Sequence, residues 1–143
     1  MSQSSTARVT VRYAETDQMG VAYYANYFVW MEVGRVELFK SMGIRYRDLE
    51  REGFLLTVVE ANCRYHQPAR YDDELLVETT VLRATSRLLE ICYLLRRSAD
   101  GAILARGHTK HLVCDRNLGP AKLPLHYRNT FASAVAPPAS PCI

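Results

Sequence analysis

The amino-acid sequence predicts an α+β domain in which one long helix packs against an antiparallel sheet. Residues 23–42 place apolar side chains three and four positions apart, which is the spacing of one face of a helix. Other segments have the alternation, or the content of Val, Leu, Ile, Thr and Tyr, that is typical of strands. These predicted strands are residues 8–14, 55–65, 74–82, 88–96 and 103–114.

The first strand and the helix carry further local signals. Val9, Val11 and Tyr13 alternate with polar residues, as in a strand with one buried face. Gly43 follows the last apolar position of the helix, where a glycine commonly ends one. Gly34 lies inside the helix, at a cost of about 1 kcal/mol relative to Ala. This glycine therefore suggests that the helix closely approaches another backbone.

Short connections between the later strands predict an antiparallel meander. Asp100-Gly101 is a hairpin turn signal, and residues 83–87 form another short connection. Residues 44–53 predict one short helical turn, and residues 67–73, with one Pro and two Asp, predict a loop. Because the helix is too apolar to lie outside, we expect the sheet to wrap around it. The open edges of such a sheet favour pairing with a second subunit.

Length, composition and charge limit the classes of function. The 143 residues, 48% hydrophobic and 23% charged, predict one domain over residues 7–131 between flexible tails at 1–6 and 132–143. A formal net charge of +3 is too small to indicate nucleic-acid binding. No apolar run approaches the ~18 residues of a membrane span, and the polar N-terminus lacks the apolar core of a secretory signal. The four cysteines are widely spaced and form no CxxC pair, which fits reduced thiols and a cytoplasmic location.

The sequence gives no sign of several common chemistries. It lacks the glycine-rich motifs of dinucleotide-binding and phosphate-loop proteins, and the GxSxG motif of serine hydrolases. His108 and His111 have the spacing HxxH, but residues three apart on a strand point to opposite faces. We therefore expect no metal site.

Asp17 lies between the first strand and the start of the helix, where two interpretations compete. In one, its carboxylate caps the helix and interacts with the helix dipole. In the other, it is a catalytic group beside the unpaired amides near residues 23–25, which could stabilise an oxyanion. Gly20 would let the backbone bend close to a substrate, and Glu15 is a competing acid two residues away. Local physics alone favours the cap, although an acid with an oxyanion donor suffices to hydrolyse a thioester.

Three stretches of the chain resemble the 4-hydroxybenzoyl-CoA thioesterase family of hot-dog-fold proteins. They are Y-x-E-T-D-x-x-G-V-x-Y-x-A-N-Y at residues 13–27, RYHQPARYDDELLVET at 64–79 and TSRLLE at 85–90. The resemblance spans residues 8–130 and implies a hot-dog fold, in which a curved five-stranded antiparallel sheet wraps a long central helix. It also implies a homodimer, often paired into a homotetramer, with active sites at the subunit interface.

The resemblance further implies an acyl-CoA thioesterase that needs no cofactor, since coenzyme A is part of the substrate. Asp17 matches the family's catalytic carboxylate, which acts as nucleophile or as general base on water. The backbone N–H of Tyr24 matches the donor to the thioester carbonyl. Many acyl-CoA thioesterases of the family have His in the position of Tyr24, so the acyl group is left open. A thioester of acyl carrier protein is the alternative substrate, and a non-catalytic acyl-CoA-binding protein is the alternative function.

The remaining predicted site residues fall into two groups. Arg83, Ser86 and Arg87 lie at a hairpin connection whose family counterpart is near the CoA nucleotide, and arginine forks suit phosphates; a solvated basic turn is the alternative. The predicted substrate-binding residues lie around the helix start, where aromatic residues and Met more often belong to the core, and where the Asn could equally bond within the helix start. They are Gly20, Val21, Asn26, Tyr27, Phe28 and Met31.

Overall fold

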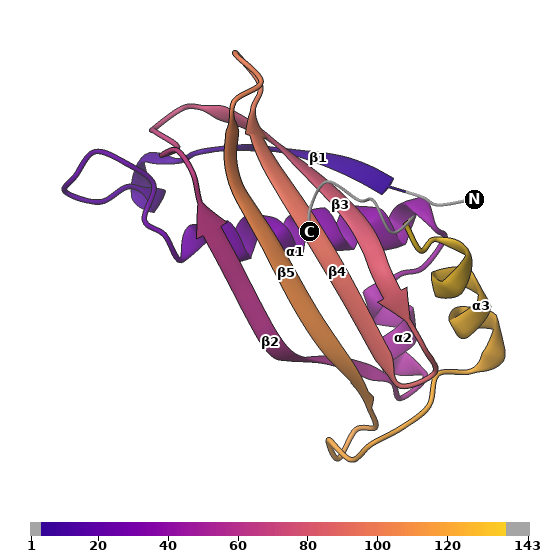
Figure 1. Cartoon of the computed structure of the whole chain (residues 1–143). Coiled ribbons are helices and arrows are strands. Elements are labelled where there is room, and N and C mark those ends of the chain that lie inside the picture. Colours follow the sequence, from indigo (N-terminus) through magenta and orange to yellow (C-terminus); the bar gives the residue numbers. More distant parts are fainter. Residues whose placement is uncertain (1–3, 137–143) are drawn as a thin grey trace.

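The computed structural model describes residues 4–136 as one antiparallel sheet with a long helix across one face (Figure 1). The strands are β1 (Ser4–Thr10), β2 (Leu55–Tyr65), β3 (Glu74–Ala84), β4 (Leu88–Arg97) and β5 (Ile103–Cys114). The helices are the 3-10 turn η1 (Tyr13–Glu15), α1 (Asn26–Ser41), α2 (Tyr46–Arg51) and α3 (Leu125–Ser133).

The five strands lie in the order β1-β3-β4-β5-β2, and every neighbouring pair is antiparallel. The predicted meander β3-β4-β5 is present, and β1 and β2 form the two edges of the sheet. The predicted α+β hot-dog fold is therefore confirmed, with α1 as its central helix.

Helix α1 lies close against β3 at Gly34. A Cβ atom at this position would be 2.5 Å from Thr79 Oγ1 and 2.7 Å from Val77 Cγ1. The buried side chains of α1 include Met31 and Phe39, both without exposed surface. The close approach suggested by the glycine is thus present, but it is made to side chains of β3.

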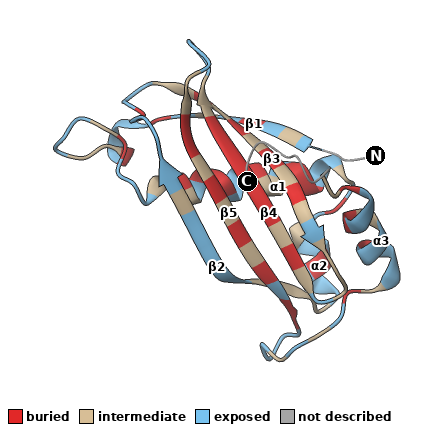
Figure 2. Cartoon of the chain, in the orientation of Figure 1, coloured by how far each residue is buried: buried red, intermediate tan, exposed pale blue. Residues whose placement is uncertain are grey.

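Burial is uneven across the sheet (Figure 2). Strands β4 and β5 are mostly buried or half-buried, whereas most residues of β2 are exposed. Val58 and Val59 on β2 are 47% and 50% exposed, beside a register shift in its pairing with β5. An apolar, exposed edge strand of this kind is the usual place where a sheet pairs with another chain.

The N-terminal segment differs from the prediction. Strand β1 begins at Ser4 and ends at Thr10, so the expected loose tail is wrong for residues 4–6. The reason is that β3 is long enough to pair with this segment, as Ser4 lies opposite Thr80. The chain then leaves the sheet at Val11 and turns through η1, where the sequence predicted continued strand.

The C-terminal segment differs as well, because α3 was not predicted. Helix α3 buries Tyr127 and Phe131, and the ring of Phe131 lies edge-on to Phe39 of α1 at 5.1 Å. After the helix, Val135 bridges to Val81 of β3, and the N–H of Ala136 donates to the Val81 carbonyl at 2.8 Å. The expected irregular tail is thus wrong for residues 132–136, and the rest of it lies outside the described residues.

The cysteines only partly match the prediction. Cys63 and Cys114 are free thiols, whereas Cys92 is disulfide-bonded, so the expectation of reduced thiols is wrong for Cys92. Cys142 lies outside the described residues. A cytoplasmic location remains a prediction. Between residues 4 and 136, no helix combines the length and apolar character that crossing a membrane requires.

Candidate active site

The segment between η1 and α1 forms a small closed loop that holds Asp17. Thr16 and Ala22 form an antiparallel bridge at its base, and the N–H of Asp17 donates to the Val21 carbonyl at 2.9 Å. The N–H of Gly20 closes the tip by donating to the Asp17 carbonyl at 3.0 Å. Gly20 has φ +78°, a left-handed conformation that favours glycine, so this residue makes the tight turn possible.

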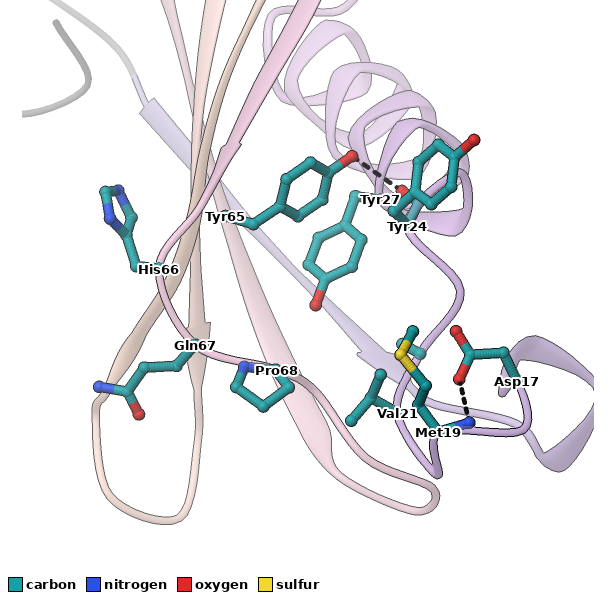
Figure 3. Close-up of a pocket in the computed structure, with 10 residues that line it drawn as sticks. Asp17, Met19, Val21, Tyr24, Tyr27, Tyr65, His66, Gln67 and Pro68 are labelled. Atoms are coloured by element: carbon teal, nitrogen blue, oxygen red, sulfur yellow. Dashed lines mark hydrogen bonds between the residues drawn. The ribbon is translucent and has the colours of Figure 1, made fainter.

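The carboxylate of Asp17 is half-buried and faces a pocket (Figure 3). Its Oδ1 accepts a hydrogen bond of 2.9 Å from the N–H of Met19 inside the loop. Within residues 4–136, the Asp17 side chain makes no hydrogen bond to an amide of α1. The carboxylate therefore braces its own loop and is not the cap of the helix.

Glu15, the competing acid, has a different place. It is only 5% exposed, and its carboxylate accepts hydrogen bonds from the N–H of Arg12 at 2.8 Å and the indole N–H of Trp30 at 3.1 Å. Its carbonyl accepts the N–H of Tyr23 at 2.8 Å and the side-chain amide of Asn26 at 2.9 Å. Glu15 is thus a buried brace between the loop and α1, with no access to the pocket.

The start of α1 supplies unpaired backbone donors. The helix begins at Asn26, three residues later than the apolar spacing predicted, after a turn at Tyr24 and Ala25. In the described part of the chain, the N–H groups of Tyr24 and Ala25 have no hydrogen-bond acceptor. Such orphan amides, aligned with the positive end of the helix dipole, favour an oxyanion nearby.

The pocket has a volume of about 290 Å³ and two walls. The loop and helix start form one wall, and the segment that follows β2 forms the other (Figure 3). The N–H of Ala22 donates to the Ala69 carbonyl at 2.8 Å, and the hydroxyl of Tyr27 accepts the N–H of Ala69 at 3.2 Å, so the walls are tied together. The lining residues are Asp17, Met19, Val21, Ala22, Tyr24, Tyr27, Tyr65, His66, Gln67 and Pro68.

Aromatic rings give the pocket its apolar surface. The ring of Tyr65 lies edge-on to Tyr27 at 4.9 Å and edge-on to Tyr24 at 6.5 Å. Burial raises the pKa of the phenols of Tyr65 and Tyr27, so both stay neutral at physiological pH. Burial also raises the pKa of the nearby Cys63 thiol to about 11, which argues against a thiolate nucleophile. Among the residues that the structure describes, Asp17 is the one carboxylate that lines this pocket.

The predicted substrate-binding residues divide between the pocket and the core. Val21 and Tyr27 line the pocket, and Gly20 shapes the loop beside it without contributing to the lining. The side-chain amide of Asn26 donates to the Glu15 carbonyl within the helix start, and Asn26 does not line the pocket. Phe28 packs against the core, and Met31, on the buried face of α1, is fully buried.

The predicted CoA-binding residues lie elsewhere. Arg83, Ser86 and Arg87 surround the β3–β4 turn, at the opposite end of the sheet from the Asp17 loop (Figure 1). Arg83 makes a 3.9 Å ion pair with Glu90, whereas Arg87 is exposed and forms no ion pair with any described residue. Within one chain this turn does not reach the pocket.

Sequence reasoning missed the second wall of the pocket, Tyr65 to Pro68. The segment was recognised as the end of a strand, a proline loop and part of the family-like stretch at 64–79, but none of its residues was assigned to the site. Its position depends on the Ala22–Ala69 bond and on Arg97, whose Nη2 donates to the Pro68 carbonyl at 3.0 Å. The available signal was the family-like stretch at 64–79, which includes these four residues.

The two histidines of HxxH lie on opposite faces of the sheet, as predicted. His111 is fully buried beside Thr109, and His108 lies 3.4 Å from Glu90. Within residues 4–136, no cluster of three His, Cys, Asp or Glu side chains has the arrangement of a metal site.

Comparison with known proteins decides the family. The family model of the thioesterase-like superfamily matches residues 11–138. The chain belongs to this superfamily. The YneP protein of Bacillus subtilis, named as a candidate acyl-CoA thioesterase, is 36% identical over 127 residues, which cover 89% of each chain.

Two further proteins similar to this chain agree with its assignment to the thioesterase-like superfamily. Acyl-CoA thioester hydrolase YbgC of Escherichia coli O6:H1 is 35% identical over 80 residues, 54% of this chain and 60% of YbgC. The crystal structure of a DHNA-CoA thioesterase from Staphylococcus aureus superposes with a TM-score of 0.87 at 26% identity, covering 91% of this chain and 89% of that one. The fold and the family of this thioesterase-like protein are therefore established together.

Proposed function

We propose that the protein hydrolyses acyl-CoA thioesters, with Asp17 as the catalytic carboxylate and the backbone N–H of Tyr24 as the oxyanion donor. The observation that carries the proposal is the pairing of these two groups in one short segment. A half-buried carboxylate faces a pocket, and unpaired amides at the start of a helix follow it directly. Relatives named as acyl-CoA thioesterases support the choice of thioester.

The chemistry needs no group beyond these. A thioester carbonyl in the pocket would accept a hydrogen bond from the Tyr24 amide, and this bond strengthens as charge develops on the oxygen. In one route the carboxylate attacks the carbonyl carbon, the thiolate of coenzyme A leaves, and water then hydrolyses the resulting mixed anhydride to free the acid and Asp17. In the other route the carboxylate removes a proton from a water that attacks the carbonyl carbon, and the thiolate leaves as the free acid forms. The apolar rings of Tyr27 and Tyr65 would hold the acyl group and exclude bulk water.

The CoA nucleotide would be bound by the partner in a homodimer. The edge strand β2 offers exposed backbone and the exposed Val58 and Val59 for antiparallel pairing with its copy. The loop before α1 and the β3–β4 turn lie at opposite ends of the sheet (Figure 1). A two-fold axis at the middle of β2 would exchange these two ends. The partner's β3–β4 turn, with Arg83, Ser86 and Arg87, would then lie beside Asp17. Pairing of two dimers into a tetramer is part of the proposal.

The test is a thiol-release assay with aryl, short-chain and long-chain acyl-CoAs on the wild type, Asp17→Asn and the control Asp48→Asn, an exposed acid on α2. We expect kcat to fall at least about a hundredfold in Asp17→Asn and to stay unchanged in the control. Full turnover by a folded Asp17→Asn protein would remove the mechanism. Tight binding of acyl-CoA without hydrolysis by the wild type would identify a binding protein instead. The same acyl group carried on acyl carrier protein distinguishes the two carriers.

A further inference from the structure

The side chain of Arg97, the last residue of β4, joins three points of the chain. Its Nη2 donates to the Pro68 carbonyl at 3.0 Å, its Nε to Asp73 Oδ2 at 3.3 Å and its Nη1 to Asp100 Oδ2 at 2.8 Å. Pro68 and Asp73 lie in the loop between β2 and β3, and Asp100 lies in the β4–β5 turn. Each nitrogen of the guanidinium thus has its own partner, and the side chain is only 20% exposed.

Pro68 lines the pocket beside Asp17, and Arg97 is its support. Proline has no N–H to donate, and within residues 4–136 the Arg97 side chain is the one donor to the Pro68 carbonyl. On one side of Pro68, the N–H groups of the two preceding residues share the Leu104 carbonyl at 2.8 and 3.2 Å. On the other side, the N–H and the carbonyl of Ala69 are both bonded to the first wall of the pocket. Arg97 therefore holds the middle of the second wall.

Two carboxylates fix the guanidinium in turn. Asp73 Oδ2 also accepts the N–H of Arg70 at 2.9 Å, and Asp100 Oδ1 accepts the N–H of Ala102 at 3.0 Å. Both acids are therefore oriented by the backbone of their own loops. Charge-assisted hydrogen bonds to several partners restrict the guanidinium of Arg97 to one orientation. The position of the second wall is thus coupled to the β4–β5 turn.

Arg97 itself has no contact with the groups proposed to react. It does not line the pocket, and none of its three side-chain bonds to described residues reaches Asp17 or Tyr24. Its link to the site is Pro68, whose ring lies on the second wall (Figure 3). A movement of this proline would change the shape of the pocket and leave the carboxylate and the unpaired amides in place.

We infer that Arg97 is a positioning residue that selects the acyl group, because it fixes the wall against which the acyl group packs. The inference rests on the proposed thioesterase function. A wall that is held in place excludes acyl groups larger than the pocket of about 290 Å³, and a wall that can move back admits them. One methylene group in a hydrophobic pocket changes discrimination by about 10- to 200-fold, so a small movement of Pro68 is enough to alter the selection.

The test uses Arg97→Lys, which keeps the charge but has a single side-chain nitrogen and cannot replace the three-way fork. The control is Arg96→Lys, because the neighbouring Arg96 donates to Glu78 Oε2 at 3.0 Å and does not line the pocket. Asp100→Asn is a second, milder variant. Its amide oxygen can still accept the N–H of Ala102, but its NH₂ group cannot accept a bond from Arg97.

Each protein is assayed with the best acyl-CoA of the substrate screen and with the homologue that has two further carbons. In Arg97→Lys we expect the preference for the smaller acyl group, measured as the ratio of kcat/KM, to fall on the order of tenfold. The change should lie in KM, and kcat with the best substrate should stay within about twofold of the wild-type value, since the reacting groups do not move. Asp100→Asn should lower the preference by a smaller factor, and Arg96→Lys should leave it unchanged.

A lower Tm in Arg97→Lys with an unchanged preference would show a structural role only and would overturn the inference. An equal loss of kcat with both acyl groups and no change in preference would overturn it too. If Arg97→Lys does not fold, Asp100→Asn decides, and a wild-type preference in that variant contradicts the inference. If the wild type hydrolyses neither acyl-CoA, the proposed function fails, and the ratio of the Kd values of the same two acyl-CoAs, measured by calorimetry, still decides on Arg97.

Discussion

The hydroxyl of Tyr65 donates a hydrogen bond of 3.0 Å to the backbone carbonyl of Tyr24 (Figure 3). Tyr65 is the last residue of β2, and Tyr24 lies two residues before the start of α1. The bond therefore joins the two walls of the pocket at the residue whose N–H we propose as the oxyanion donor. The Tyr24 carbonyl shares a peptide group with the unpaired N–H of Ala25, so the bond also restrains the backbone beside both unpaired amides.

Tyr65→Phe tests this relationship, because it removes the hydroxyl and keeps the ring that lines the pocket. A neutral hydrogen bond contributes about 1 kcal/mol, so we expect kcat to fall roughly fivefold. KM should change less, since the apolar surface for the acyl group is retained. The measurement is steady-state hydrolysis of the best acyl-CoA found in the substrate screen.

Tyr71→Phe is the matched control for this prediction. Tyr71 is 59% exposed and packs on Tyr13, outside the pocket. An equal loss of kcat in both variants, or an effect of Tyr65→Phe on KM alone, would show that the Tyr65 hydroxyl does not position the donor.

Glu15→Gln should lower both stability and activity, because Glu15 is the brace behind the active-site loop. Both oxygens of its carboxylate accept N–H donors, from Arg12 and from the Trp30 indole. Glutamine has one acceptor only, so its NH₂ group would face a donor in a buried site. We expect a loss of about 1–3 kcal/mol in the free energy of unfolding, measured with urea, and a lower kcat.

Glu50→Gln serves as the reference for this substitution, since Glu50 is exposed on α2. If Glu15→Gln unfolds no more easily than Glu50→Gln, the carboxylate is not the brace that its contacts suggest.

The sequence predicted the fold well where the pattern was local. Strands β2 and β5 have the predicted ends, because long apolar runs there are bounded by clear turn residues. Helix α3 was missed because only Tyr127 and Phe131 among its nine residues are buried, too few for a recognisable period. The start of β1 was missed because its polar Ser and Thr residues depend on β3 for their pairing.

The site was predicted only in part, for a related reason. Asp17 and the helix start are adjacent in sequence, so spacing and resemblance could bring them together. Tyr65 reaches them from a strand forty-one residues beyond Tyr24, through contacts that no local pattern encodes. Local sequence did not separate Glu15 from Asp17, which the resemblance alone favoured, and burial now distinguishes the brace from the acid in the pocket.

Gly34→Ala should destabilise the protein, although alanine is the better helix former by about 1 kcal/mol. The added Cβ would lie 2.5 Å from Thr79 Oγ1 and 2.7 Å from Val77 Cγ1, both on buried residues of β3. Overpacking of this kind costs about 1–3 kcal/mol, so the steric cost exceeds the gain in propensity. Thermal unfolding measures the difference. A higher Tm in Gly34→Ala would mean that α1 can move away from the sheet.

Stability should fall in mild acid because of His111. The imidazole is fully buried, and its Nε2 lies 2.8 Å from Thr109 Oγ1. Burial, and then the charge of Arg35, lower the pKa of His111 from 6.5 to about 4. Between these values the unfolded chain binds a proton that the folded chain does not bind, so stability rises with pH across this window.

The expected size is up to about 3 kcal/mol, all of it lost between pH 6.5 and pH 4 and none above pH 6.5. His111→Gln removes the titrating group, so its unfolding free energy, measured with urea at each pH, should lack this component. His126→Gln, which changes an exposed histidine of α3, should keep the wild-type profile. If the wild type and His111→Gln lose stability in parallel over this range, the acid sensitivity arises from carboxylates and His111 is not its source.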